Sequence, residues 1–173
     1  MENKKIAFTG LVTALMIVSA FIKIPIQPVP ITFQPFVVLL IPMVFGVKIS
    51  FSGVFIYLLV GLLGLPVFAN GGGPAYILKP TFGYLLGFLI STIPVGFFSK
   101  KINNLKGRLI GGVIGLFFIY SLGVLYLYLN INYIQDKNFP FFTALKLGFF
   151  LPIGFDIVKL VLASIIAGKI KIN

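Results

Sequence analysis

Long apolar runs that carry almost no charge dominate this chain. Only 10% of its 173 residues are Asp, Glu, Lys or Arg, whereas a soluble domain has about 25%. So few charges could not cover the surface of a soluble protein that is 59% hydrophobic, and disorder requires low hydrophobicity. The pattern therefore predicts an all-α integral membrane protein and excludes most soluble enzymes.

The apolar runs predict six transmembrane helices in a single domain, residues 1–173. A bilayer core about 30 Å thick needs roughly 17–25 apolar residues per spanning helix. The run at 36–47 is short, so we expect it to tilt little or to begin inside the preceding loop. Residues 139–151 are too few to span, and we expect an interfacial or re-entrant helix there. The expected spans lie at residues 6–22, 36–47, 51–63, 81–98, 109–129 and 152–168.

Basic residues lie in short clusters between these runs and set the expected orientation. Six spans put both termini on one side, which holds nine basic residues: Lys4, Lys5, Lys48, Lys100, Lys101, Lys106, Arg108, Lys169 and Lys171. The other side holds four: Lys23, Lys79, Lys137 and Lys146. Because cytoplasmic loops are enriched in Lys and Arg, we expect both termini in the cytoplasm of a cell-membrane protein. The long loops 23–35 and 64–80 then lie outside and cover a binding site.

The distribution of the basic residues also indicates which partners the chain has. A net charge of +11 is compatible with nucleic acid, but the basic residues form no continuous stripe. Their places between apolar runs are those that membrane topology requires. We therefore expect contact with membrane lipid and no nucleic-acid partner.

Side chains for acid–base or metal chemistry are scarce. The chain has no Cys and no His, and its acids are Glu2, Asp136 and Asp156. Without thiolate or imidazole we expect no metal site, no cofactor and no enzymatic acid–base machinery. The GxxxxGK[ST] motif is also missing, so the chain has no P-loop of its own for ATP.

Asp156 and Lys159 are the two charges inside an expected span. An ionisable residue at the centre of a membrane helix costs about 2.5–3.5 kcal/mol on insertion scales and usually has a function. The i, i+3 spacing places both residues on one helix face. They form either a self-neutralising pair that permits insertion or a binding site in which the carboxylate accepts hydrogen bonds and the ammonium meets an anion.

The two long loops supply further candidates for a ligand site. Thr32 and Gln34 are the polar residues near the end of a proline-rich loop, and they either contact a ligand or solvate the backbone. Asn70 opens the run Asn-Gly-Gly-Gly, which forms either a flexible turn or an anion-binding nest of backbone N–H groups. Tyr76 and Tyr84 flank the outer end of the 81–98 span, where tyrosines usually anchor a helix at the interface. Contact with a ligand is the alternative, and we count Tyr84 among the candidate ligand-binding residues.

Gly10 and Ala14 place two small residues at i, i+4 in the first span. Such spacing lets another helix approach closely. Packing within the same chain is the usual explanation, and a docking face for a partner is the alternative.

Four segments, in order, resemble the BioY family, the biotin-specific S components of energy-coupling factor (ECF) transporters. Together they extend from the first loop to the last span. They are residues 27–34 (QPVPITFQ), 64–72 (GLPVFANGG), 80–88 (PTFGYLLGF) and 156–159 (DIVK).

The resemblance implies a six-helix subunit that binds biotin from outside with high affinity and mediates its uptake. It implies three partner subunits, a transmembrane coupling protein and two cytoplasmic ATPases. It also implies that Asp156, Lys159 and Asn70 contact biotin, and that Gly10 and Ala14 stand where the family has an AxxxA docking motif. Residues 80–84 read Pro-Thr-Phe-Gly-Tyr, whereas the family often has Pro-Thr-Gly-Gly-Tyr. Phe82 therefore replaces the first glycine of that pattern, and Tyr84 matches its tyrosine.

Two alternatives remain open from the sequence. The chain could be an S component for a different vitamin, although the DxxK pair and the glycine loop favour biotin. It could also be a membrane scaffold subunit without transport, whose charged pair is only structural.

Overall fold

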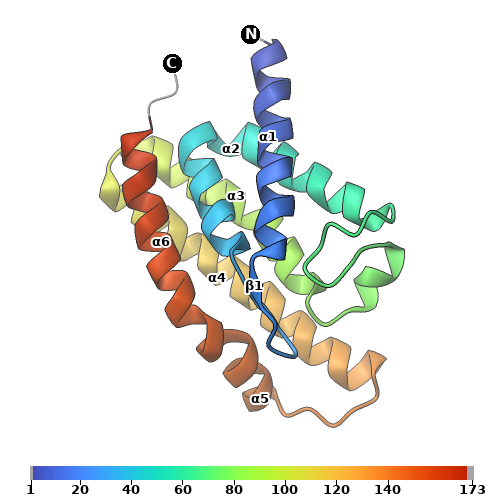
Figure 1. Ribbon diagram of the computed structural model, residues 1–173. Coiled ribbons are helices and arrows are strands. Elements are labelled where there is room, and N and C mark those ends of the chain that lie inside the picture. Colours follow the sequence, from blue (N-terminus) through green and yellow to red (C-terminus); the bar gives the residue numbers. More distant parts are fainter. Residues whose placement is uncertain (1, 171–173) are drawn as a thin grey trace.

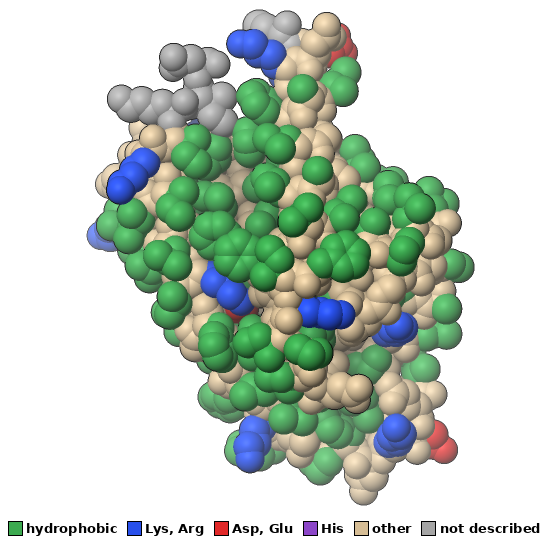
Figure 2. All heavy atoms as spheres, viewed as in Figure 1, with side chains coloured by type: hydrophobic (Ala, Val, Ile, Leu, Met, Phe, Trp, Pro, Cys, Tyr) green, Lys and Arg blue, Asp and Glu red, His purple; other side chains and the backbone are tan. Residues whose placement is uncertain are grey.

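Five long apolar helices build the protein, and the computed structural model describes residues 2–170 (Figure 1). Each of the five, taken with its helical extensions, is long and apolar enough to cross a membrane. Hydrophobic side chains dominate the face seen in Figure 2, as contact with lipid requires. The helices are α1 (Glu2–Phe21), α2 (Gln34–Leu62), α3 (Phe82–Ile102), α4 (Leu105–Leu129) and α6 (Leu151–Lys169).

A break at Gly46 divides α2 into two segments. Gly46 has φ 76° and ψ 177°, a combination that is strained for any residue with a Cβ atom. The first half of α2 runs toward the end of the molecule where α1 begins, and the second half turns away from that end (Figure 1). The expected spans 36–47 and 51–63 are these two halves, joined directly without a loop.

The helix that ends the chain begins earlier than the sequence predicts. The helix α5 (Phe141–Leu145) and the π-helical turn η3 (Lys146–Phe150) lead into α6 with helical backbone at both junctions. The prediction of a separate interfacial helix at 139–151 was wrong, because no loop precedes Pro152. At the other end of α4, a second π-helical turn, η2 (Asn130–Ile134), extends that helix.

Pro152 is accommodated inside this continuous helix by Tyr84 of α3. Proline has no N–H to donate to the carbonyl four residues earlier, which is that of Gly148. The Tyr84 hydroxyl donates to the Gly148 carbonyl at 2.8 Å instead. A Cβ atom at Gly148 would lie 2.5 Å from that hydroxyl oxygen, so the contact requires glycine.

The proline-rich loop folds back as a short antiparallel hairpin. Strands β1 (Lys23–Ile24) and β2 (Ile31–Thr32) pair with Lys23 opposite Thr32. The Phe33 N–H donates to the Ile22 carbonyl at 2.9 Å, which closes the base of the hairpin. The sequence predicts extended backbone here, and it does not reveal the pairing.

The glycine-rich loop packs against the hairpin and against itself. Lys23 donates to the Ala69 carbonyl, and Lys79 donates to the Asn70 carbonyl at 2.7 Å. The short 3₁₀ helix η1 (Pro74–Leu78) then leads into α3. These bonds hold the loop over the end of the bundle that carries the hairpin.

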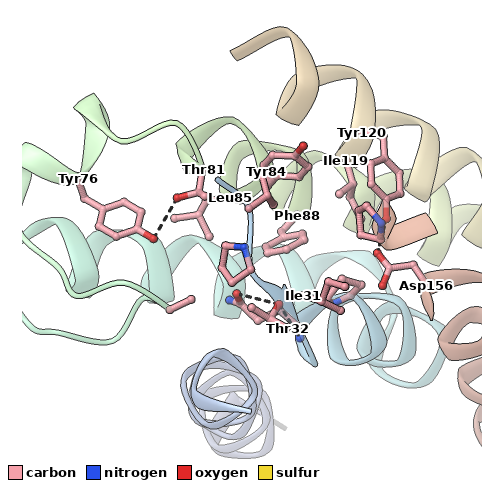
Figure 3. Close-up of a pocket in the computed structure, with 16 residues that line it drawn as sticks. Ile31, Thr32, Tyr76, Thr81, Tyr84, Leu85, Phe88, Ile119, Tyr120 and Asp156 are labelled. Carbon is pink, nitrogen blue, oxygen red and sulfur yellow. Dashed lines mark hydrogen bonds between the residues drawn. The ribbon is translucent and has the colours of Figure 1, made fainter. Parts of the chain in front are cut away.

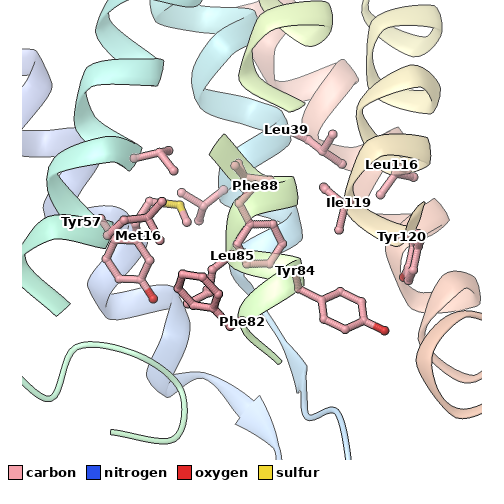
Figure 4. Close-up of a cluster of buried hydrophobic side chains, with 14 of the residues drawn as sticks. Met16, Leu39, Tyr57, Phe82, Tyr84, Leu85, Phe88, Leu116, Ile119 and Tyr120 are labelled. Atoms are coloured by element: carbon pink, nitrogen blue, oxygen red, sulfur yellow. The ribbon is translucent and has the colours of Figure 1, made fainter. Parts of the chain in front are cut away.

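Close helix packing gives the bundle its core. A Cβ atom at Gly87 of α3 would lie 2.6 Å from the Ile119 Cα atom of α4, so glycine lets these two backbones approach closely. Buried side chains including Met16, Leu39 and Phe88 fill the space between the helices (Figure 4).

The start of α1 and the end of α6 lie at the end of the molecule opposite the hairpin (Figure 1). Lys5, Lys48, Lys100 and Lys101 line one groove there, and Arg108 contacts Gly168 near the end of α6. Lys171, counted above among the basic residues of this side, lies outside the described residues.

Candidate functional site

A small cavity of about 50 Å³ lies beneath the hairpin, between the start of α2 and helices α3, α4 and α6 (Figure 3). Ligand pockets commonly enclose about 300–1,000 Å³, so a ligand of that size requires this cavity to widen. Leu85, Phe88 and Ile119 supply apolar walls. The polar side chains that line the cavity are Thr32, Gln34, Tyr76, Thr81, Tyr84, Tyr120 and Asp156.

Asp156 presents a buried carboxylate at one side of this cavity. Its Oδ2 atom accepts a 2.6 Å hydrogen bond from the Tyr120 hydroxyl, and its Oδ1 atom accepts from Lys159 at 2.7 Å. Only 5% of the Asp156 side chain is exposed. A carboxylate oxygen has two lone-pair sites, so each oxygen can accept one further bond from a ligand.

Lys159 lies behind Asp156 and is not among the cavity-lining residues. Its ammonium group donates to Asp156 and, at 2.7 Å, to the Thr32 carbonyl at the end of the hairpin. In this structure Lys159 therefore neutralises the carboxylate and ties α6 to the hairpin. The two alternatives from the sequence, a self-neutralising ion pair and a binding site at Asp156, are therefore compatible.

Thr32 and Gln34 line the cavity where the hairpin enters α2. Thr32 is 9% exposed and Gln34 is 2% exposed. The Gln34 side-chain amide donates to the Tyr57 hydroxyl at 2.9 Å, and its backbone N–H donates to the Thr32 hydroxyl at 3.3 Å. Both side chains are held by hydrogen bonds within the protein, and contact of either one with a ligand stays a prediction.

The aromatic side chains differ in what they offer a ligand. Tyr76 and Thr81 lie on the side away from Asp156, with their hydroxyl oxygens 3.3 Å apart (Figure 3). Tyr84 presents its ring to the cavity, since its hydroxyl bonds to the Gly148 carbonyl. The interpretation of Tyr76 and Tyr84 as interface anchors was wrong, because both are buried.

Asn70 does not line this cavity. It is exposed and borders an outer hollow that also includes Lys79 and Gln135. Of the two alternatives for the glycine run, the anion-binding nest is not supported, because the N–H groups of Gly71 and Gly73 donate to the carbonyls of Phe68 and Gly61. The glycines fold the loop back on itself and leave Ala69 at the cavity wall.

Gly10 and Ala14 lie on the outer face of α1, and both are exposed. A Cβ atom at Gly10 would meet no atom within 4 Å. Packing within the chain was therefore the wrong interpretation of this pair, and a docking face for a partner stays a prediction.

Tyr120 and Thr81 are site residues that the sequence did not single out. The run 109–129 holds four hydroxyl-bearing residues, Tyr120, Ser121, Tyr126 and Tyr128, so the sequence alone does not set Tyr120 apart. Its direction toward Asp156 depends on how α4 packs against α6. Thr81 is the first residue of the expected span 81–98, and nothing in the sequence sets it apart as a site residue.

Fold and site together define a class of protein. Apolar helices enclose a cavity whose walls are largely hydrophobic and whose hydrogen-bonding groups lie at separate places. Such a site suits a small molecule with an apolar body and a polar head. The protein is a multi-pass membrane protein with an internal cavity of this kind.

Comparison with known proteins narrows this class. The sequence profile of the BioY family matches residues 1–172. "Biotin transporter BioY" of Thermotoga maritima is 40% identical over 163 residues, which cover 94% of this chain and 92% of the relative. "Biotin transporter BioY2" of Lactococcus lactis is 32% identical over 177 residues, covering 95% and 90%.

A solved structure agrees with these relatives. It is the crystal structure of the S-component for biotin from an ECF-type ABC transporter, with a TM-score of 0.84 and 30% identity. The alignment covers 97% of this chain and 90% of that one. The present chain belongs to the BioY family, and the resemblance inferred from its sequence is confirmed.

Proposed function

We propose that this protein is the biotin-binding S component of an ECF transporter and mediates biotin uptake. The observation that carries the proposal is the buried carboxylate of Asp156, held by Tyr120 and Lys159 at a largely apolar cavity. Family membership and the names of the relatives support the choice of biotin.

The chemistry of biotin suits this arrangement. Biotin combines a flat ureido group, which has two N–H donors, with an apolar bicycle and an aliphatic chain that ends in a carboxylate. The remaining lone pairs of Asp156 can accept the ureido N–H bonds, which are stronger for a charged acceptor. Phe88, Leu85 and Ile119 can cover the rings. A look-alike without the donors would leave the buried carboxylate incompletely paired, which gives selectivity.

The hairpin acts as the lid of this site in the proposal. Lys159 links the Thr32 carbonyl of the hairpin to Asp156 at the cavity. A ligand that bonds to Asp156 therefore acts on the same network that holds the hairpin down. Entry of biotin requires the hairpin or the glycine loop to move, since both lie over the cavity.

Coupling to ATP hydrolysis requires partners in this proposal. We propose a transmembrane coupling protein and two cytoplasmic ATPases, as the family implies, with Gly10 and Ala14 on the docking face of α1. The two halves of α2 cross the membrane separately, which gives six spans. Both termini then face the cytoplasm, in agreement with the excess of basic residues at their end of the molecule.

Biotin titration of the purified protein tests the proposed function. We expect saturable binding with one site per chain and no displacement by excess thiamine or riboflavin. Displacement of biotin by either vitamin would favour an S component for a different substrate. Failure to bind any of the three would favour the scaffold alternative.

A further inference from the structure

A second hollow lies at the end of the bundle opposite the hairpin. It is a groove of about 660 Å³. It forms where α1 begins, where α2 is broken at Gly46 and where α3 ends. The groove belongs to no part of the biotin site, and the proposed function leaves it without a role.

Lysines from three helices converge on this groove. Lys5 comes from α1, Lys48 from α2, and Lys100 and Lys101 from α3. None of its described lining residues is acidic. None of the four lysines forms a salt bridge within residues 2–170. The groove therefore carries concentrated positive charge, with no acidic side chain among the described residues that line it.

The remaining walls of the groove are mainly apolar. Phe97 lies beneath Lys101, whose ammonium nitrogen is 5.5 Å from the centre of the ring. Phe97 is 52% exposed, and Ile93, one turn earlier on α3, is 47% exposed. The apolar wall thus continues from the groove onto the side of α3 that faces away from the core.

We propose that this groove binds the headgroup of an anionic phospholipid, with the lysines around its phosphate and an acyl chain along α3. Basic pockets between transmembrane helices are typical sites for such headgroups. The ends of the helices place the lysines at the level of the headgroups, and the apolar surface of Phe97 and Ile93 suits a lipid chain better than an acidic peptide. The bound lipid bridges α1, the broken α2 and α3.

Native mass spectrometry of the protein released from nanodiscs tests this proposal. The nanodiscs contain equal amounts of phosphatidylcholine and phosphatidylglycerol. We expect the wild-type protein to retain phosphatidylglycerol at least tenfold over phosphatidylcholine. The triple variant K48Q/K100Q/K101Q should lose this preference, since each lysine near an anionic lipid contributes about fivefold.

A matched variant controls for net charge. K106Q/K146Q/K169Q also removes three positive charges, but from positions outside the groove, and it should keep the wild-type preference for phosphatidylglycerol. Biotin binding reports correct folding in both variants. Where the triple variant fails to accumulate, K48Q and K100Q are measured singly, and each should weaken retention about fivefold.

Three results would overturn the proposal. They are equal retention of the two lipids by the wild-type protein, an unchanged preference in the groove variant, and an equal loss in the control variant. If the groove variant keeps its lipid preference but no longer associates with a coupling protein, the groove is a protein-docking surface instead.

Discussion

At the scale of single residues, the site depends on how one carboxylate is held. Asp156 sits in a membrane helix, where an unpaired charge is costly. Lys159 compensates its charge, and Tyr120 fixes its orientation through a neutral donor. This division leaves the carboxylate paired and at the wall of the cavity.

Replacing Tyr120 with phenylalanine tests this positioning role. Y120F removes the 2.6 Å bond to Oδ2, and hydrogen bonds to charged groups contribute about 1.5–3 kcal/mol. We expect biotin affinity to fall about tenfold or more by calorimetric titration. Y133F is the control, since Tyr133 is 76% exposed. Unchanged affinity in Y120F would show that Tyr120 does not position the carboxylate.

At the scale of the elements, α3 and the final helix are joined at one place. Tyr84 of α3 satisfies the Gly148 carbonyl in η3, one turn before Pro152, and both Tyr84 and Pro152 line the cavity. The proline that interrupts the helix ladder therefore also creates the acceptor that links the helix to α3.

Two glycines in this helical stretch allow a matched test of the link. G148A places a Cβ atom 2.5 Å from the Tyr84 hydroxyl, whereas a Cβ atom at Gly154 meets nothing within 4 Å. Overpacking typically lowers the free energy of unfolding by about 1–3 kcal/mol. Each kcal/mol lowers the melting temperature of a protein of this size by about 2–4 °C. We expect G148A to melt several degrees lower in detergent and G154A to match or exceed the wild type, because alanine favours helix. Equal melting of the two variants would refute the link.

The sequence predicted some parts of this architecture and not others, for physical reasons. Asp156 and Lys159 were recognisable because charge inside an apolar run is rare. Thr32 and Gln34 reach the cavity as expected, although their role toward a ligand stays a prediction. The continuity of the helix through Pro152 was missed, since the sequence does not show that Tyr84 replaces the lost donor. The sequence also could not predict that Asn70 is exposed, because the glycines beside it permit many backbone conformations.

At the scale of the whole molecule, the distribution of charge argues for one orientation in the membrane. Most basic residues gather at the end where α1 begins and α6 finishes, and the hairpin and glycine loop lie at the other end (Figure 1). The proposed orientation places the ligand site toward the outside and the lysine groove toward the cytoplasm.

The natural lack of cysteine permits a direct test of orientation. K106C places a thiol at the start of α4, near the basic end, and N138C places one in the loop after η2. Both positions are exposed. We expect a membrane-impermeant maleimide to label N138C in intact cells and K106C only after permeabilisation. The reverse pattern would invert the proposed topology.

The central claim is that the ionised Asp156 carboxylate binds biotin, and titration of D156N tests it most directly. Asparagine keeps the size of the side chain but removes the charge and replaces one acceptor oxygen with a donor. Asp136, which is exposed, provides the matched control D136N. The account predicts that D156N loses biotin affinity by at least about a hundredfold, since two charge-assisted bonds weaken together, while D136N binds as the wild type does. Binding by D156N within twofold of the wild type would contradict it.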